Sequence, residues 1–96
     1  MLTEIVNTTR LKIVDRKKNN PLSNWVKSAQ FIAPGYSLSE FITKESLSGI
    51  IAEFKRKSPS KGIINDKLDV IETTSGYVAS GASALSVLTE QDYFMG

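Results

Sequence analysis

The sequence predicts an α/β fold in which a helical extension, residues 1–48, precedes a parallel strand–helix–strand unit, residues 49–96. Two observations predict this order. At Gly49 the hydrophobic residues change from the spacing of amphipathic helices to a continuous β-rich run. A second apolar run, Ala84–Leu88, follows a helical pattern, and a crossover of this kind joins parallel strands with a right-handed connection.

The composition restricts both the partners and the chemistry of the chain. Its 96 residues suffice for one small domain, and 12 Lys and Arg against 10 Asp and Glu give a net charge of +2. This excess is too small to indicate nucleic acid or an anionic membrane as a partner. Since cysteine and histidine are absent, disulfides, thiolate metal sites and a histidine base are excluded. Acid–base chemistry must then use Lys, Glu, Asp or Tyr.

The N-terminal residues predict no targeting or membrane segment. The stretch MLTEIVNTTRLK lacks a basic segment followed by an apolar run, so we expect no secretory signal. No stretch approaches the roughly 18 uninterrupted apolar residues of a membrane span. A cytoplasmic protein is therefore expected.

Three helices are predicted in the extension. Thr3 and Glu4 suit the start of the first, and the basic run Arg16–Lys18 suits its last turn. Pro21 suits the first turn of a second helix. The apolar stripe of that second helix is Leu22, Trp25, Val26 and Ala29. Ser37 and Glu40 have the spacing of a capping box, which predicts a short third helix through Phe41 and Ile42.

The strand–helix–strand unit is predicted element by element. Ile50–Lys55 forms the first strand, and a long loop follows to about Lys67. Asp66 or Asp69 caps a helix that runs to about residue 80, where Gly81 suits a C-terminal glycine cap. Residues 84–88 form the second strand, and residues 89–96 begin another loop.

Two parallel strands and one helix cannot cover both faces of a sheet, and parallel sheets are normally covered on both. The sequence therefore predicts the opening part of a larger α/β fold that stops in a loop. A complete (β/α)8 barrel takes about 250 residues, and this chain would supply about a quarter of its strands. Unpaired strand edges also predict that the isolated chain is marginally stable or self-associates.

The first predicted strand places two opposite charges on one face. Since residues two apart in a strand share a face, Ile51, Glu53 and Lys55 point one way and Ala52 and Phe54 the other. In a barrel, inward residues near the C-terminal strand ends line the active site. Glu53 and Lys55 then form a buried pair suited to acid–base work. The alternative is a solvated strand edge with a weak salt bridge.

Two stretches strongly resemble one family. IIAEFKRKSPSKG, residues 50–62, and GASALSVLTEQDYFMG, residues 81–96, resemble the indole-3-glycerol-phosphate synthases of tryptophan biosynthesis. The shared parts are I-A-E-x-K, the loop S-P-S-K-G and the strand S-V-L-T followed by an aromatic pair. EIVNTTRLKIVDRKKNNPL, residues 4–22, resembles the extra helices that precede the barrel in this family.

This resemblance implies a lyase with the TIM-barrel fold. Its substrate is 1-(2-carboxyphenylamino)-1-deoxyribulose 5-phosphate, and ring closure with loss of carbon dioxide and water needs no metal or organic cofactor. By the same resemblance, Lys55 meets the substrate carboxylate and assists as an acid, and Glu53 positions Lys55. Ser58 lies near the carboxylate, Phe94 packs on the anthranilate ring, and Lys61 has a minor role in a mobile loop.

Simpler interpretations stand beside these roles. Ser58 could serve only the Ser-Pro turn, and Phe94 could be a core residue. Arg56 and Lys57 are expected to be solvated loop charges, because the basic run is too short to indicate nucleic-acid binding.

The family's main general-acid lysine, its general-base glutamate and its phosphate-binding loops belong to later strands. We therefore expect residues 1–96 to be inactive alone. The alternative function is a non-catalytic assembly module that pairs with a complementary C-terminal barrel piece or with itself. Another phosphosugar barrel, phosphoribosylanthranilate isomerase, fits less well because of the S-P-S-K-G loop.

Overall fold

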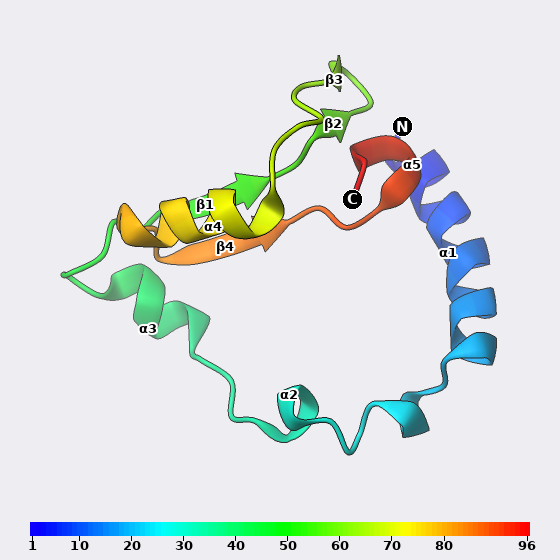
Figure 1. The fold of residues 1–96 in the computed structure, drawn as a ribbon, viewed down its shortest axis with the longest axis horizontal. Helices are drawn as coiled ribbons and strands as arrows, with labels where there is room; N and C mark the ends of the chain where they lie inside the picture. Colours follow the sequence, from blue (N-terminus) through cyan, green and yellow to red (C-terminus); the bar gives the residue numbers. More distant parts are fainter. The chain divides into compact units, whose positions relative to one another are not determined.

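The computed structural model describes residues 1–96, which form two compact units, Met1–Tyr36 and Ser37–Gly96. The first unit contains only helical elements, and the second contains the strands (Figure 1). None of the helices combines the length and the apolar character needed to cross a lipid bilayer.

Helix α1, Leu2–Asn19, confirms the first predicted helix. Glu4 lies in its first turn, and Arg16, Lys17 and Lys18 lie in its last turn, where each charge opposes the helix dipole. No residue of α1 is buried within the described chain, and Leu2 and Leu11 are each 74% exposed. The apolar residues of α1 therefore remain available for contacts.

The prediction of one continuous second helix is wrong. A short 3₁₀ turn, η1 (Leu22–Asn24), is followed by a separate four-residue helix, α2 (Ala29–Ile32). The break lies at Ser28, whose backbone is extended and whose hydroxyl accepts a hydrogen bond from the Phe31 amide. Serine hydroxyls compete with the helical hydrogen-bond pattern in this way, so Ser28 starts a new helix rather than continuing the old one.

Helix α3, Leu38–Thr43, begins where the capping pattern predicts. The Ser37 hydroxyl accepts a hydrogen bond from the Glu40 amide at 3.3 Å. This contact satisfies one of the backbone donors that the first turn of a helix leaves unpaired.

A parallel strand–helix–strand unit follows, as predicted. Strand β1 (Ile51–Phe54) pairs with β4 (Ala84–Val87), and helix α4 (Val70–Ala79) makes the crossover and lies on the strand pair (Figure 1). The register pairs Ile51 with Ala84 and continues to the pair of Phe54 with Val87. Phe54 is 3% exposed and is the buried hydrophobic residue of the unit.

The two ends of α4 are fixed by local contacts. Asp69, rather than Asp66, is the N-cap, because its carboxylate accepts a hydrogen bond from the Glu72 amide at 2.8 Å. At the other end Gly81 has φ +99°, a left-handed conformation that favours glycine, and Ala82 N–H donates to the Tyr77 carbonyl. The predicted glycine cap is therefore confirmed.

The loop predicted after the first strand contains a small hairpin. Strand β2 (Lys57–Ser58) pairs antiparallel with β3 (Gly62–Ile63). Gly62 has φ +66°, and the Lys61 amide donates to the Ser58 hydroxyl at 3.2 Å. The predicted long loop is therefore present, but it contains a hairpin whose turn is closed by a side-chain hydroxyl and a left-handed glycine.

The segment predicted to be a loop after the second strand also contains a helix. Helix α5 (Gln91–Phe94) is capped by Glu90, whose carboxylate accepts hydrogen bonds from the Asp92 and Tyr93 amides. The Gly96 amide then donates to the Glu90 carbonyl. A Cβ atom on Gly96 would collide with the backbone of Thr89, so only glycine fits at this position.

Two basic side chains connect the segments on the carboxyl side of the strands. Arg56 donates to the Leu68 carbonyl at 2.9 Å and to the Met95 carbonyl at 3.2 Å. Lys57 donates to the Asp92 carbonyl at 3.1 Å. The expectation that Arg56 and Lys57 are solvated loop charges is therefore incomplete, because both side chains are partly exposed but also donate to backbone carbonyls of other segments.

Asp69→Ala tests the cap of α4. We expect it to lower the free energy of unfolding by about 1 kcal/mol, because an unpaired amide replaces a capped one. Urea denaturation followed by circular dichroism measures this loss. Asp66→Ala removes a carboxylate from the loop before α4 and should change the free energy of unfolding by less than about 0.3 kcal/mol. Equal losses in the two variants would contradict the assignment.

Arg56→Gln tests the connection between the segments. Without the guanidinium, the amides of residues 91–96 should exchange with deuterium about tenfold faster, because the segment loses a charge-assisted hydrogen bond. Hydrogen exchange with mass spectrometry measures the rates. Lys61→Gln, which removes a positive charge from the exposed hairpin turn, is the control. Unchanged amide exchange rates in Arg56→Gln would show that residues 91–96 keep their structure without the hydrogen bond from Arg56.

Candidate active site

The two sides of β1 have different surroundings. Ala52 and Phe54 lie on the side that faces α4, and Leu85 of β4 lies beside α4 residues on the same side. Ile51 and Glu53 lie on the other side, together with their register partners on β4. Ile51 is 53% exposed there. The strand alternation therefore leaves Glu53 on the open side of the sheet.

Glu53 and Lys55 form an ion pair at the carboxyl end of β1. The Lys55 ammonium nitrogen lies 3.4 Å from one carboxylate oxygen of Glu53. Their side chains are 36% exposed for Lys55 and 46% exposed for Glu53. The predicted buried pair is thus partly open to solvent in this chain, and an ion pair so exposed adds only about 0–1 kcal/mol to stability.

Sequence reasoning missed one polar residue of this group. The Ser86 hydroxyl donates a hydrogen bond of 2.9 Å to the second carboxylate oxygen of Glu53. Ser86 is the register partner of Glu53 on β4. Two signals were available: Ser86 is the lone polar residue within the second apolar strand, Ala84–Leu88, and it begins the S-V-L-T stretch that carries the resemblance. Neither signal points to Glu53 until the two strands are aligned.

The loop residues form a second group. Ser58 is 6% exposed, and its hydroxyl accepts from the Lys61 amide and lies 3.4 Å from the Ser60 hydroxyl. The hydroxyl therefore serves the turn, as the simpler interpretation predicts. Lys61 is exposed at the tip of that turn.

Phe94 lies on α5 and is partly exposed. Helix α5 packs against β2, and the Lys57 ammonium donates to the Asp92 carbonyl between them. The structure thus brings the segment of Phe94 next to the segment of Ser58. Glu53, Lys55 and Ser86 form a separate group through direct side-chain contacts.

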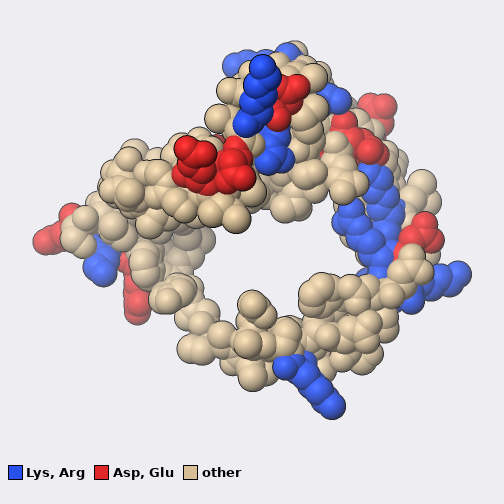
Figure 2. Space-filling view, in the orientation of Figure 1, with Lys and Arg blue, Asp and Glu red and all other residues tan.

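The charged residues are distributed unevenly. Lys and Arg outnumber Asp and Glu in Met1–Tyr36, and the reverse holds in Ser37–Gly96. Figure 2 shows blue side chains along α1 and an intermingling of blue and red around the β2–β3 hairpin. No three Asp or Glu side chains gather closely enough to hold a metal ion.

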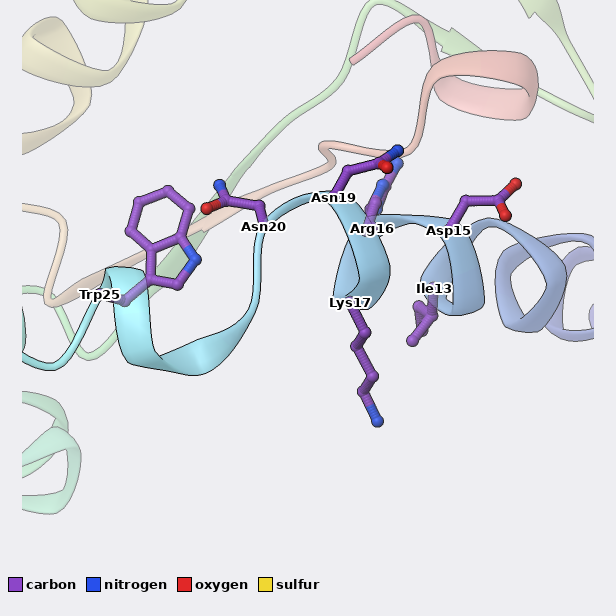
Figure 3. A pocket seen from close by; sticks show the side chains of 7 residues that line it. All are labelled: Ile13, Asp15, Arg16, Lys17, Asn19, Asn20 and Trp25. Atoms are coloured by element: carbon purple, nitrogen blue, oxygen red, sulfur yellow. The ribbon is translucent and has the colours of Figure 1, made fainter.

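A surface depression of about 460 Å³ lies in the first unit, where α1 ends. Its lining residues point in different directions rather than toward one point (Figure 3). They are Ile13, Asp15, Arg16, Lys17, Asn19, Asn20 and Trp25. None of the predicted site residues contributes to its lining.

Comparison of the sequence with known proteins links the chain to one family. The family model described as indole-3-glycerol phosphate synthase matches residues 2–96. An indole-3-glycerol phosphate synthase of Carboxydothermus hydrogenoformans is 39% identical, over 99% of this chain and 38% of its own length. That of Bacteroides thetaiotaomicron is 35% identical, over 100% of this chain and 36% of its own length.

The chain therefore spans less than two fifths of the length of these curated relatives. Within that span, the family match includes both of the stretches that carry the resemblance, residues 50–62 and 81–96. The match from residue 2 onward also includes the N-terminal helices. This chain belongs to the indole-3-glycerol phosphate synthase family.

Proposed function

We propose that this chain contributes the N-terminal helices and the first two strands, β1 and β4, of a (β/α)8 barrel. The barrel would close the indole ring of indole-3-glycerol phosphate. One observation carries the proposal: Glu53 and Lys55 stand on the open side of β1, at its carboxyl end, in a chain that the family model matches over residues 2–96. In such barrels the carboxyl ends of the strands and the loops that follow them form the active site.

The reaction converts 1-(2-carboxyphenylamino)-1-deoxyribulose 5-phosphate by forming the ring carbon–carbon bond and releasing carbon dioxide and water. In this proposal the Lys55 ammonium holds the substrate carboxylate until it leaves, and it assists as an acid. Glu53 orients that ammonium through their ion pair. No organic cofactor or metal takes part in the proposed scheme.

The loop residues complete the proposed substrate contacts. The Ser58 hydroxyl accepts from the Lys61 amide and, when the Ser60 hydroxyl donates to it as well, keeps its own hydrogen to donate toward a carboxylate. Phe94 would pack on the anthranilate ring from α5. Lys61 would add a positive charge at the exposed turn. The backbone contacts of Arg56 and Lys57 support this placement, because they hold the segments of Ser58 and Phe94 together.

We further propose that residues 1–96 do not turn over substrate by themselves. The two-stranded sheet leaves one strand edge unpaired on each side, and its open side carries Glu53 and Lys55 at 46% and 36% exposure. Electrostatic catalysis needs a site from which water is excluded. A complementary barrel piece that pairs with these edges would supply that enclosure, and self-association through the same edges is the alternative assembly.

A chimera tests the catalytic role of Lys55. Residues 1–96 would be joined to the remaining part of the Carboxydothermus hydrogenoformans relative, and product would be followed by indole fluorescence. Lys55→Met keeps an unbranched side chain that is one atom shorter and removes its charge, so kcat/KM should fall roughly a hundredfold or more. Lys67→Met, in the loop before α4, is the matched control. Equal activity of the two variants would remove Lys55 from the mechanism.

Mixing tests the assembly proposal. We expect no product from the 96-residue chain alone, and product when the separately expressed remainder of the same relative is added, because the two pieces complete one site. Sedimentation velocity on each piece and on the mixture measures the association. Turnover by the chain alone would contradict the proposal, and so would a mixture that sediments as two independent species.

A further inference from the structure

We propose that Ser86 is a positioning residue of the active site, which fixes the carboxylate of Glu53 and, through it, the ammonium of Lys55. This inference rests on the proposed function, because it assigns Ser86 a part in the same site. The inference is based on two contacts of the Glu53 carboxylate, one at each of its oxygens. Ser86 donates to one carboxylate oxygen of Glu53 at 2.9 Å, and Lys55 lies 3.4 Å from the other oxygen.

The hydrogen bond between Ser86 and Glu53 connects two paired strands, β4 and β1, at a defined register. Glu53 and Ser86 are direct partners in the parallel ladder, although they are 33 residues apart in the sequence. The strand backbones are fixed by their hydrogen bonds, and serine has a short side chain with one principal torsion angle. The hydroxyl is therefore a fixed donor, whereas a contact to a long, exposed side chain would move with that side chain.

Glu53 needs such a partner because it is 46% exposed and its remaining contact is an exposed ion pair. Pairs of this kind are weak, since both side chains give up rotational freedom and water screens the charges. A carboxylate bound at one oxygen can still rotate around its side-chain torsions. Contacts at both oxygens, from Ser86 on β4 and from Lys55 just after β1, select one orientation of the carboxylate and so direct the Lys55 ammonium.

The surroundings restrict which residue can act here. The neighbours of Ser86 on β4, Leu85 and Val87, lie on the side of α4 and cannot reach Glu53. An acidic residue in place of Ser86 would put two like charges opposite each other. An apolar residue would leave one carboxylate oxygen of Glu53 without a donor from the protein. Serine and threonine are thus the small side chains that can donate without adding charge.

The first experiment measures orientation without activity. Ser86→Thr and Ser86→Val have the same shape and differ in one hydroxyl, and both suit a strand. In the 96-residue chain, three-bond NMR couplings report the χ1 rotamer of Glu53. We expect a single rotamer in the unchanged chain and in Ser86→Thr, and averaged couplings in Ser86→Val. Ser75→Ala, which removes a hydroxyl from α4, should leave the couplings unchanged.

The second experiment measures the consequence for the reaction, in the same full-length chimera as above. A loss of orientation should lower kcat by roughly tenfold to a hundredfold in Ser86→Val, with KM changed by less than about threefold. Ser86→Thr should recover most of the lost kcat. A purely structural role would instead lower the melting temperature of Ser86→Val and leave its kcat at low temperature equal to that of Ser86→Thr.

The outcomes separate this inference from the proposed function. Equal Glu53 couplings in the Val and Thr variants would overturn the positioning role, whatever the chimera does. Different Glu53 couplings with equal kcat values in these two variants would show that the orientation of Glu53 by Ser86 does not matter for the reaction. An inactive unsubstituted chimera would count against the proposed function, while the couplings would still decide whether Ser86 fixes Glu53.

Discussion

The parallel pairing of β1 with β4 is the constraint on which the remaining structure depends. Its register sets Glu53 opposite Ser86, and its direction brings the carboxyl ends of both strands to the same edge. Helix α4 can make the crossover only if it packs on one side of the pair, which is where Phe54 is buried. The other side is therefore left for polar residues.

The difference between the two sides of the strand pair determines where the polar site residues can lie. Strand alternation separates an apolar side, which packs on α4, from a side that can carry a carboxylate and an ammonium without burying them beneath the helix. The segments after the two strands start from the same edge, so Arg56 and Lys57 of the first can donate to carbonyls of the second. A site built on strand ends and closed by loops is the usual arrangement in (β/α)8 barrels.

The sequence predicted the elements whose signals are local. The Ser37 cap and the Gly81 cap were both visible, because each depends on contacts within a few residues. The break at Ser28 and the short helix α5 were missed, since serine and glutamate fit either a helix interior or a cap, and backbone geometry decides between them. Contacts between distant residues were inaccessible: Ser86 meets Glu53 across 33 positions, and Arg56 meets Met95 across 39.

The register of β1 against β4 is tested most directly by disulfide cross-linking. The chain contains no cysteine of its own, so only the introduced pair can form a disulfide within the chain. Ile51→Cys with Ala84→Cys joins two register partners. Their Cα atoms should lie within the roughly 4.4–6.8 Å that a disulfide spans, so this pair should oxidise readily to a disulfide. Ile51→Cys with Ser86→Cys is displaced by two residues and should stay reduced. A disulfide in the displaced pair alone would show a different register, and Glu53 would no longer face Ser86.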